Sequence, residues 1–522
     1  MGHTPILRML KRAAAEAAQA YEKENFEQYG YSRRQFLKGA AVLTAAASVP
    51  SFVWNFDTLT AQAAGSKVAI VGGGLAGLTC AYRLKKYGVE ANVYEATKRV
   101  GGRCWTRRDY FADHQIAENG GELIDTDHKA IRKLANELGL SLDNLLAAEQ
   151  SGTKPFFYFK GRPYTYDQAT ADIQAIMPQL NKDLKDAGYP TTYHQYTMRG
   201  KQLDYMSITD WIEAYVPGGL NSNLGKLLDV AYTIEYGVES SQQSSLNLIY
   251  LLGGTDQSQL ELFGASDEKY RVRGGNDQIA SLLGKELSSQ INLGYKLNKL
   301  VKNLDETYTL SFNGKPNVTV DYVVMTVPFS VLRSNVDFSR AGFRPLKVKA
   351  INEQGMGTNA KLLAQFSDRH WCKLGNNGLT YADTGYQNTW EVTRSQNGKS
   401  GILVEYTGGL IGEALNQGTL RYQTNKFLDE IEPVLPGITE KWNGTSAIVY
   451  WPGMSWTKGS YSYWKIGQYT SFSGVEGEPE GNVFFAGEHC SQDYQGFMNG
   501  AVDTGEQAAT GILKALKVAL AK

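Results

Sequence analysis

A glycine-rich turn between an apolar strand and a helix constrains the fold of this chain most strongly. The strand covers 67–71, the turn reads Gly-Gly-Gly-Leu-Ala-Gly, and the next residues up to Tyr87 form a helical pattern. Glycines at this spacing permit a tight turn and a close approach of a pyrophosphate to the N-terminus of the helix. The residues of the turn that we expect to contact a pyrophosphate are Gly72, Gly74, Leu75, Ala76 and Gly77.

A second strand at 91–94 ends in Glu95, an acid at the place where a carboxylate accepts the ribose hydroxyl groups of an adenine dinucleotide. Strand, turn, helix, strand and acid together predict a Rossmann-like βαβ unit. The alternative, a glycine-rich turn in an unrelated α/β protein, explains only the turn.

The residues after Glu95 favour a flavin over a nicotinamide. Arg99-Val100-Gly101-Gly102-Arg103 supplies two glycines and two cations that a simple nicotinamide dehydrogenase does not need. From here the sequence resembles the flavin amine oxidase family, in which this segment wraps the FAD pyrophosphate. The resemblance assigns Gly102 and Arg103 to the cofactor, whereas Arg99 is equally well a surface charge.

Two distant segments extend the resemblance over nearly the whole mature chain. The strand and proline turn at 323–328 resemble the part that closes the FAD domain, and 482–509 resembles the last strand, turn and helix under the flavin. A helix N-terminus at that place favours the reduced, anionic flavin. The resemblance implies cofactor contacts by Gly487, Glu488 and Ala501, with an exposed turn acid as the alternative for Glu488.

The order of these motifs implies an α/β fold in which a Rossmann-like FAD domain is interleaved with a substrate domain of mixed sheet and helices. We expect helices in the first insertion, at 130–138 and 224–236, and strands in the second, at 361–366 and 401–406. The expected bounds are 65–125, 266–345 and 475–522 for the FAD domain, and 126–265 and 346–474 for the substrate domain.

Lys361 is the first candidate for chemistry, because it is a lone cation at the start of the apolar strand 360–366. Members of the family carry a lysine here that binds a water beside flavin N5. The resemblance therefore implies a role in flavin reoxidation or in the fate of the imine. The alternative is a lysine whose head reaches solvent.

An aromatic pair is the second candidate. Tyr461 and Phe497 match the two positions that sandwich the substrate amine over the flavin in monoamine oxidases. At the second position this chain has Phe497 instead of the commoner tyrosine. Aromatic faces favour an amine by roughly 0.5–2 kcal/mol. Core packing is the alternative for any single ring, and we expect it for Trp451 or Trp456. Ser460 stands where covalent members have a cysteine, so we expect FAD to be held non-covalently.

Related L-amino-acid oxidases use an arginine for the substrate carboxylate, and its approximate position here holds Leu123. Glu122 is either a satisfied turn acid or a partner for a second amino group. Arg271 or Arg273 remains available as a carboxylate ligand, so amino-acid substrates stay open.

These observations predict an FAD-dependent oxidase that converts an amine to an imine and dioxygen to hydrogen peroxide. The alternatives are an L-amino-acid oxidase and, in another class, a flavin-binding structural protein with an inactive site. Small-molecule amines or amino acids and dioxygen or another electron acceptor are the expected partners, and a homodimer is left open.

Composition excludes other classes of protein. Lys plus Arg and Asp plus Glu are both 53, so no net charge attracts nucleic acid. The six histidines and four cysteines show no metal-ligand spacing, and we expect no metal and four buried thiols.

The N-terminus resembles a twin-arginine export signal over residues 1–63. Ser-Arg-Arg-Gln-Phe-Leu-Lys at 32–38 precedes a small apolar run and an Ala-Gln-Ala cleavage pattern at 61–63, although an amphipathic helix with two chance arginines has some of these features. The resemblance implies the twin-arginine translocase as a partner, export of the folded protein with its cofactor, and a periplasmic or secreted location. No later stretch approaches the length of a membrane span.

Overall fold

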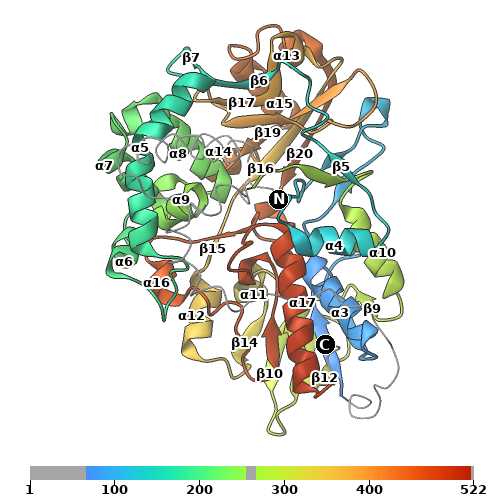
Figure 1. Cartoon of the computed structure of the whole chain (residues 1–522). Coiled ribbons are helices and arrows are strands. Elements are labelled where there is room, and N and C mark those ends of the chain that lie inside the picture. Colours follow the sequence, from blue (N-terminus) through green and yellow to red (C-terminus); the bar gives the residue numbers. More distant parts are fainter. Residues whose placement is uncertain (1–65, 254–265, 519–522) are drawn as a thin grey trace, which may run out of the picture.

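The structure, a computed structural model, describes residues 66–253 and 266–518 (Figure 1). The predicted export signal lies outside these residues. The described chain builds a dinucleotide part around a parallel sheet, a second part around a larger sheet, and a layer of helices against the latter. No helix in these two described ranges is long and apolar enough to cross a membrane.

The first sheet has five strands in the order β22-β13-β1-β2-β9, and all four pairings are parallel. Side chains of a strand alternate between its two faces, and β1 shows this directly. Val68 and Ile70 join one hydrophobic cluster, whereas Ala69 and Val71 join another. A sheet buried on both faces explains why the strand is continuously apolar. The five strands are β1 (Val68–Val71), β2 (Ala91–Glu95), β9 (Ile291–Leu293), β13 (Tyr322–Met325) and β22 (Val483–Phe485).

Four helices cover the face of Val68 and Ile70 and share their cluster. In Figure 1, α17 and α3 lie side by side across this sheet. The four helices are α3 (Leu75–Lys86), α4 (Lys129–Glu137), α10 (Asp277–Glu286) and α17 (Met498–Ala515).

The opposite face, with Ala69 and Val71, packs against a four-stranded sheet of order β12-β11-β10-β14. Leu300 and Leu310 from this sheet are fully buried in the shared cluster. The strands are β10 (Leu297–Lys302), β11 (Tyr308–Phe312), β12 (Val318–Val320) and β14 (Asp337–Arg340).

The second part contains a seven-stranded sheet of order β20-β16-β19-β18-β17-β6-β7. Leu362 and Ala364 of β16 pack on one face with α15 (Leu420–Ile431), and Leu363 packs on the other with the helical layer. Lys361 shares the face of Leu363 because the two residues are two positions apart. The strands are β6 (Lys154–Phe159), β7 (Arg162–Tyr164), β16 (Ala360–Phe366), β17 (Asn376–Ala382), β18 (Asn388–Glu391), β19 (Gly401–Thr407) and β20 (Trp442–Tyr450).

The helical layer begins with α5, whose N-terminus is fixed by a capping box between Thr165 and Gln168. Trp211 and Tyr232 are fully buried in its shared core. The helices are α5 (Tyr166–Ala187), α6 (Met198–Asp204), α7 (Ile208–Tyr215), α8 (Asn223–Tyr236) and α9 (Ser245–Leu252).

Shorter elements connect these layers. They are β3 (Thr106–Arg107), β4 (Ala117–Glu118), β5 (Leu142–Asn144), β8 (Tyr270–Val272), β15 (Gly355–Met356), β21 (Ser462–Tyr463), α11 (Phe329–Asn335), α12 (Pro345–Glu353), α13 (His370–Lys373), α14 (Gly409–Ala414) and α16 (Gln468–Phe472).

The predicted α/β class with interleaved parts is confirmed, because strands of the first sheet come from both ends of the described chain and strands of the seven-stranded sheet lie between them. The expected helices coincide with α4 and α8, and the expected strands with β16 and β19. Helix α4, which we placed in the substrate domain, packs with the core of the first sheet. The exact domain bounds stay a prediction.

Three of the four thiols are buried as expected, at Cys80, Cys104 and Cys490. Cys372 differs, because its position at the end of α13 leaves it partly exposed.

Candidate cofactor and active site

A cavity lies where the β1–α3 turn meets segments from 94–104, 326–336, 451–461 and 487–501. It gathers most of the predicted site residues, although they are far apart in sequence. Those that line it are Gly72, Gly74, Leu75, Ala76, Glu95, Gly102, Arg103, Tyr461, Gly487, Glu488, Phe497 and Ala501. Gly77 and Lys361 are not among the residues that line this cavity.

The glycine turn opens the first helix toward the cavity. Gly72 has φ +113°, and a Cβ added to Gly77 would lie 2.1 Å from the carbonyl oxygen of Gly72, so both positions require glycine. A Cβ added to Gly74 would meet no protein atom within 4 Å and would project into the cavity. Gly74 is also the N-cap of α3 and provides no side-chain cap. The first N–H groups of α3 are therefore positioned for an anionic ligand such as a pyrophosphate.

Glu95 occupies the place predicted for a ribose ligand. Its Oε2 accepts a hydrogen bond from the N–H of Gly73 at 2.8 Å, and its Oε1 accepts one from the N–H of Thr97 at 2.8 Å. Each oxygen keeps a lone pair for a further donor. The buried carboxylate is thus oriented at the cavity wall and is suited to two ribose hydroxyl groups.

Arg103 and Glu488 form an ion pair at the wall, with 2.8 Å between Nη1 and Oε1. The same Nη1 donates to the carbonyl oxygen of Ser460 at 2.7 Å, while Glu488 accepts from Ser462 Oγ at 2.8 Å and from the N–H of Gly496 at 3.0 Å. Burial alone would raise the pKa of Glu488, but Arg103 and these donors hold it below its usual value. The reading of Glu488 as an exposed turn acid is wrong, because the side chain is buried.

A second helix, α17, also begins at the cavity. Its N-cap Phe497 makes no side-chain cap, its first turn contains no acid, and Ala501 lines the cavity. The positive end of the helix dipole therefore faces the same space as that of α3. Two helix N-termini, an oriented acid and a glycine-lined opening fit an FAD with its pyrophosphate at α3.

Lys361 is buried, so the alternative of a head group in solvent is wrong. Its Nζ donates to Glu122 Oε2 at 2.7 Å and to the carbonyl oxygens of Glu118 and Gly120 at 3.2 Å each. An ammonium has three N–H donors, and these contacts use all three. The expected water beside flavin N5 stays a prediction. To bind that water, Lys361 must give up one of its three present hydrogen bonds.

Tyr461 and Phe497 line the same cavity. Tyr461 directly precedes β21, and Phe497 stands at the start of α17. The hydroxyl groups of Tyr461 and Tyr406 lie 3.0 Å apart, and the Tyr461 hydroxyl also donates to the carbonyl oxygen of Glu235. Burial raises the pKa of Tyr461 well above its usual value. The ring stays neutral and fixed. Trp451 packs with it as expected of a core residue.

The two arginines considered for a substrate carboxylate are engaged elsewhere. Arg271 is buried and donates to the carbonyl oxygens of Val392 at 2.6 Å and Arg394 at 3.2 Å. Arg273 pairs with Asp143, and its side chain is 70% exposed. In the described lining of the cavity the arginines are Arg99, which donates to the carbonyl oxygens of Val100 and Gly102, and Arg103, which pairs with Glu488.

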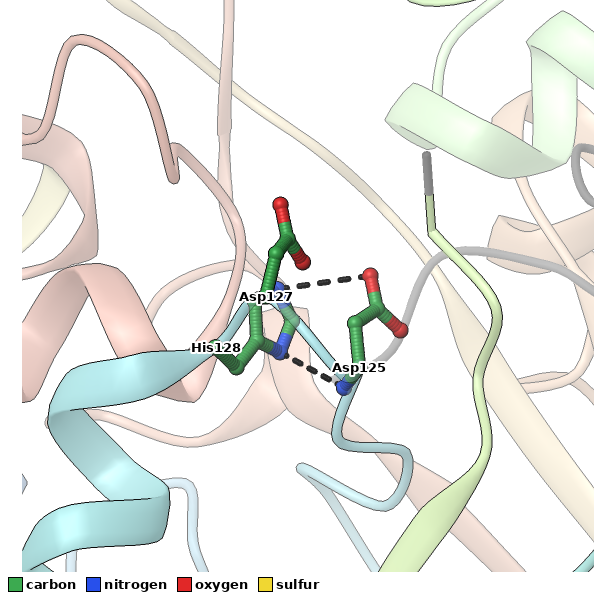
Figure 2. A group of neighbouring side chains, drawn as sticks. All are labelled: Asp125, Asp127 and His128. Atoms are coloured by element: carbon green, nitrogen blue, oxygen red, sulfur yellow. Dashed lines mark hydrogen bonds and ion pairs between the residues drawn. The ribbon is translucent and has the colours of Figure 1, made fainter. Parts of the chain in front are cut away.

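A His–Asp pair next to Phe497 was missed from the sequence (Figure 2). Asp125, Asp127 and His128 place three ligand atoms within 4.8 Å of one another. However, His128 Nδ1 accepts the N–H of Asp125 at 2.9 Å, so the neutral ring carries its proton on Nε2, 3.4 Å from Asp125 Oδ2. That proton favours a His–Asp pair over a metal ligand. The ring packs edge-on against Phe497 at 4.6 Å.

Sequence comparison agrees with this geometry. A family model described as flavin-containing amine oxidoreductase matches residues 75–513. The chain belongs to this family. It is therefore a flavin enzyme that acts on amines and uses FAD, and Ser460 offers no thiol for a covalent bond to the cofactor.

Relatives of this flavin amine oxidoreductase cover most of its length. An L-amino acid dehydrogenase of Synechocystis is 24% identical, covering 87% of this chain and 96% of that protein. A flavin-containing amine oxidase A of Sus scrofa is 24% identical over 86% and 85% of the two chains. The solved structure of cyclohexylamine oxidase from Brevibacterium oxydans has a TM-score of 0.75 at 19% identity, covering 87% of this chain and 99% of the other. The last comparison supports the fold.

A second family model, for the twin-arginine translocation signal, matches residues 30–50. The predicted signal is confirmed. The flavin amine oxidoreductase is exported by the twin-arginine pathway to the periplasm or beyond.

Proposed function

We propose that this enzyme oxidises an amine without an α-carboxylate to the imine, with dioxygen as the electron acceptor. The observation that carries the proposal is the lining of the cavity. Tyr461 and Phe497 supply aromatic faces, and the two arginines of the described lining, Arg99 and Arg103, are bonded to backbone carbonyl groups and to Glu488. An amine with an apolar substituent can pack between these aromatic rings. A carboxylate at the same place would be buried without a guanidinium partner.

An FAD held at the β1–α3 turn would supply the two-electron redox chemistry, as acceptor for the hydride equivalent that the amine loses from its α-carbon. The neutral amine nitrogen loses one proton as the hydride equivalent leaves the α-carbon, and the imine takes up water after release to give an aldehyde or ketone and ammonia or a smaller amine. Dioxygen takes two electrons and two protons and leaves as hydrogen peroxide. The role of Tyr461 and Phe497 is to orient the amine and to exclude water.

The second candidate is an L-amino-acid oxidase, and the similarity to the L-amino acid dehydrogenase of Synechocystis favours it. The two candidates differ in the group that must bind the substrate carboxylate. Leu123 at the approximate position of the arginine in such oxidases is buried and apolar.

Matched substrate pairs distinguish these candidates. The purified holoenzyme is given phenethylamine and phenylalanine, tyramine and tyrosine, and cadaverine and lysine, and peroxide release and anaerobic bleaching of the flavin are measured. We expect oxidation of the amine of at least one pair with kcat/KM at least 100-fold above that of its amino acid. Preference for the amino acids overturns the proposal in favour of the second candidate. If neither amines nor amino acids bleach the flavin, the proposal is overturned in favour of a flavin-binding protein with an inactive site.

A further inference from the structure

Five consecutive carbonyl groups, at 118–122, are each held by a side chain from another part of the chain. Lys361 binds two of them, Trp451 Nε1 donates to Asn119 at 2.9 Å, and Asn276 Nδ2 donates to Gly121 at 3.0 Å and Glu122 at 2.7 Å. Gly121 lines the cofactor cavity. This segment is therefore fixed in place and contributes Gly121 to the wall of the cavity, and the Lys361 ammonium donates to two of its five carbonyl groups.

The Glu122 side chain is the third acceptor of Lys361 and has a partner on each oxygen. Oε2 accepts from Lys361 Nζ at 2.7 Å, and Oε1 accepts from Trp390 Nε1 at 3.1 Å. Both charged side chains are 2% exposed. The ammonium also lies 5.4 Å from the centroid of the Trp390 ring. The negative charge of Glu122 thus compensates a cation that is removed from water.

The same contacts reach the aromatic pair. The Trp390 ring lies 5.1 Å from the ring of Tyr406, whose hydroxyl lies 3.0 Å from that of Tyr461. A continuous set of contacts therefore connects Glu122 with one residue of the proposed amine site.

We propose that Glu122 is a positioning residue for this enzyme: it fixes the ammonium of Lys361 against the 118–122 wall, and the two residues act as one unit in holding the cofactor and in turnover. The part that concerns turnover rests on the proposed function, whereas the part that concerns the cofactor does not.

Glutamine at position 122 separates charge from shape. A carboxylate offers two acceptor oxygens, but an amide offers one acceptor and one N–H donor. In Glu122→Gln either Lys361 or Trp390 must therefore face an N–H group, and the buried ammonium loses its counter-charge. Lys361 is then no longer fixed at the carbonyl groups of the wall.

A double-mutant cycle tests the unit. We expect Glu122→Gln to raise the dissociation constant of FAD by about tenfold to hundredfold and Lys361→Met to raise it similarly, since each removes a charged hydrogen bond. The double variant should resemble the single ones, because the second change removes nothing further. In turnover, kcat should fall at least tenfold while KM changes less than threefold, because neither substitution removes the hydrogen bonds of Tyr461 to Tyr406 and Glu235 that hold its ring in place.

Asp183→Asn is the matched control. Asp183 is also fully buried, and it accepts from Arg199 Nη2 at 2.7 Å and from Trp211 Nε1 at 2.9 Å, but it lies in α5. It should lower the unfolding temperature without changing FAD affinity or kcat. The inference is overturned if Glu122→Gln retains the FAD affinity of the parent, if the two single effects multiply in the double variant, or if Asp183→Asn produces the same loss of FAD.

The FAD titration needs no substrate, so it decides the inference even where no amine is oxidised. If Glu122→Gln does not fold, Glu122→Asp and the neutral pair Glu122→Leu with Lys361→Met replace it. The shorter carboxylate should recover part of the FAD affinity, whereas the neutral pair should fold and bind FAD as weakly as Lys361→Met. Recovery by the neutral pair to the affinity of the parent overturns the inference.

Discussion

Glu488→Gln should weaken both the fold and the binding of FAD, because one carboxylate joins three parts of the cavity wall. In the parent, Glu488 accepts from Arg103 at 2.8 Å, from Ser462 Oγ at 2.8 Å and from the N–H of Gly496 at 3.0 Å. Glutamine retains the volume but removes the charge, and its amide N–H₂ must face at least one of these donors.

The size of the effect follows from burial. Removing one partner of a fully buried ion pair costs about 3–5 kcal/mol. The Arg103 side chain is 18% exposed and Glu488 is 6% exposed, so water reduces the loss to about 2–3 kcal/mol, or roughly 30- to 150-fold in an equilibrium constant. Since Arg103 also lines the cavity, part of this loss should appear as weaker FAD binding.

The assays are urea unfolding of the holoenzyme and titration of the apoenzyme with FAD. Glu391→Gln is the control, because Glu391 pairs with Arg369 at 2.6 Å and accepts from Trp371 at 3.2 Å in the seven-stranded sheet. The control should lose stability and retain FAD affinity in the titration. Unchanged unfolding and unchanged FAD affinity in Glu488→Gln would refute the reasoning.

The effect should also depend on pH with a defined sign. The folded-state pKa of Glu488 lies below its ordinary value of 4.5, so its contribution to stability is complete above that value and is lost as the pH falls through the folded pKa. The difference in unfolding free energy between the parent and Glu488→Gln should therefore be full at pH 7 and decrease in acid. A constant difference down to pH 3 would contradict this.

Four further predictions use other parts of the structure. Gly74→Ala should leave the unfolding temperature within about 2 °C of the parent, because a Cβ at this position meets no protein atom within 4 Å, yet it should weaken FAD binding about tenfold by entering the opening at α3, as titration of the apoenzyme measures. Lys361→Met, measured with saturating FAD, should retain amine binding and slow flavin reoxidation or imine handling by roughly 10- to 1000-fold in stopped-flow half-reactions, and equal rates in both half-reactions would show that the lysine acts only in holding the fold and the cofactor. Denaturation of the purified enzyme should release its FAD, since Ser460 cannot form a thioether; flavin that stays with the polypeptide after gel filtration in denaturant contradicts this. Arg33→Lys together with Arg34→Lys should abolish export, and an undiminished periplasmic yield on immunoblotting would count against the twin-arginine signal.

The sequence predicted the cofactor site well where the chemistry is local. The turn from Gly72 to Gly77 and the acid at Glu95 are close in sequence, and their spacing alone requires the βαβ geometry. The assignment of the distant Glu488 depended on the resemblance to a family. Its burial and its pairing with Arg103 depend on a contact across 385 positions that no local pattern contains.

The partner of Lys361 was not predicted for the same reason. Glu122 lies 239 positions away, and the two residues meet only because β16 of one sheet passes the wall segment of the other part. A lone lysine in an apolar strand signals that a buried counter-charge exists, but it does not say which acid supplies it. Arg271 shows the converse, since its cationic side chain was considered for substrate binding and is used to bind backbone carbonyl groups.

Because α17 is near the C-terminal end of the described chain, the cofactor cavity can be completed only late in synthesis. The cavity begins at the β1–α3 turn and is completed by residues 487–501, so its two halves are synthesised at opposite ends of the mature chain. A ribosome must release almost the whole polypeptide before both helix N-termini can face one pyrophosphate and flavin. A chain that ends before β22 should therefore be colourless after purification. For a protein exported by the twin-arginine pathway, a yellow colour in the cytoplasmic precursor would report that β22 and α17 are in place before export.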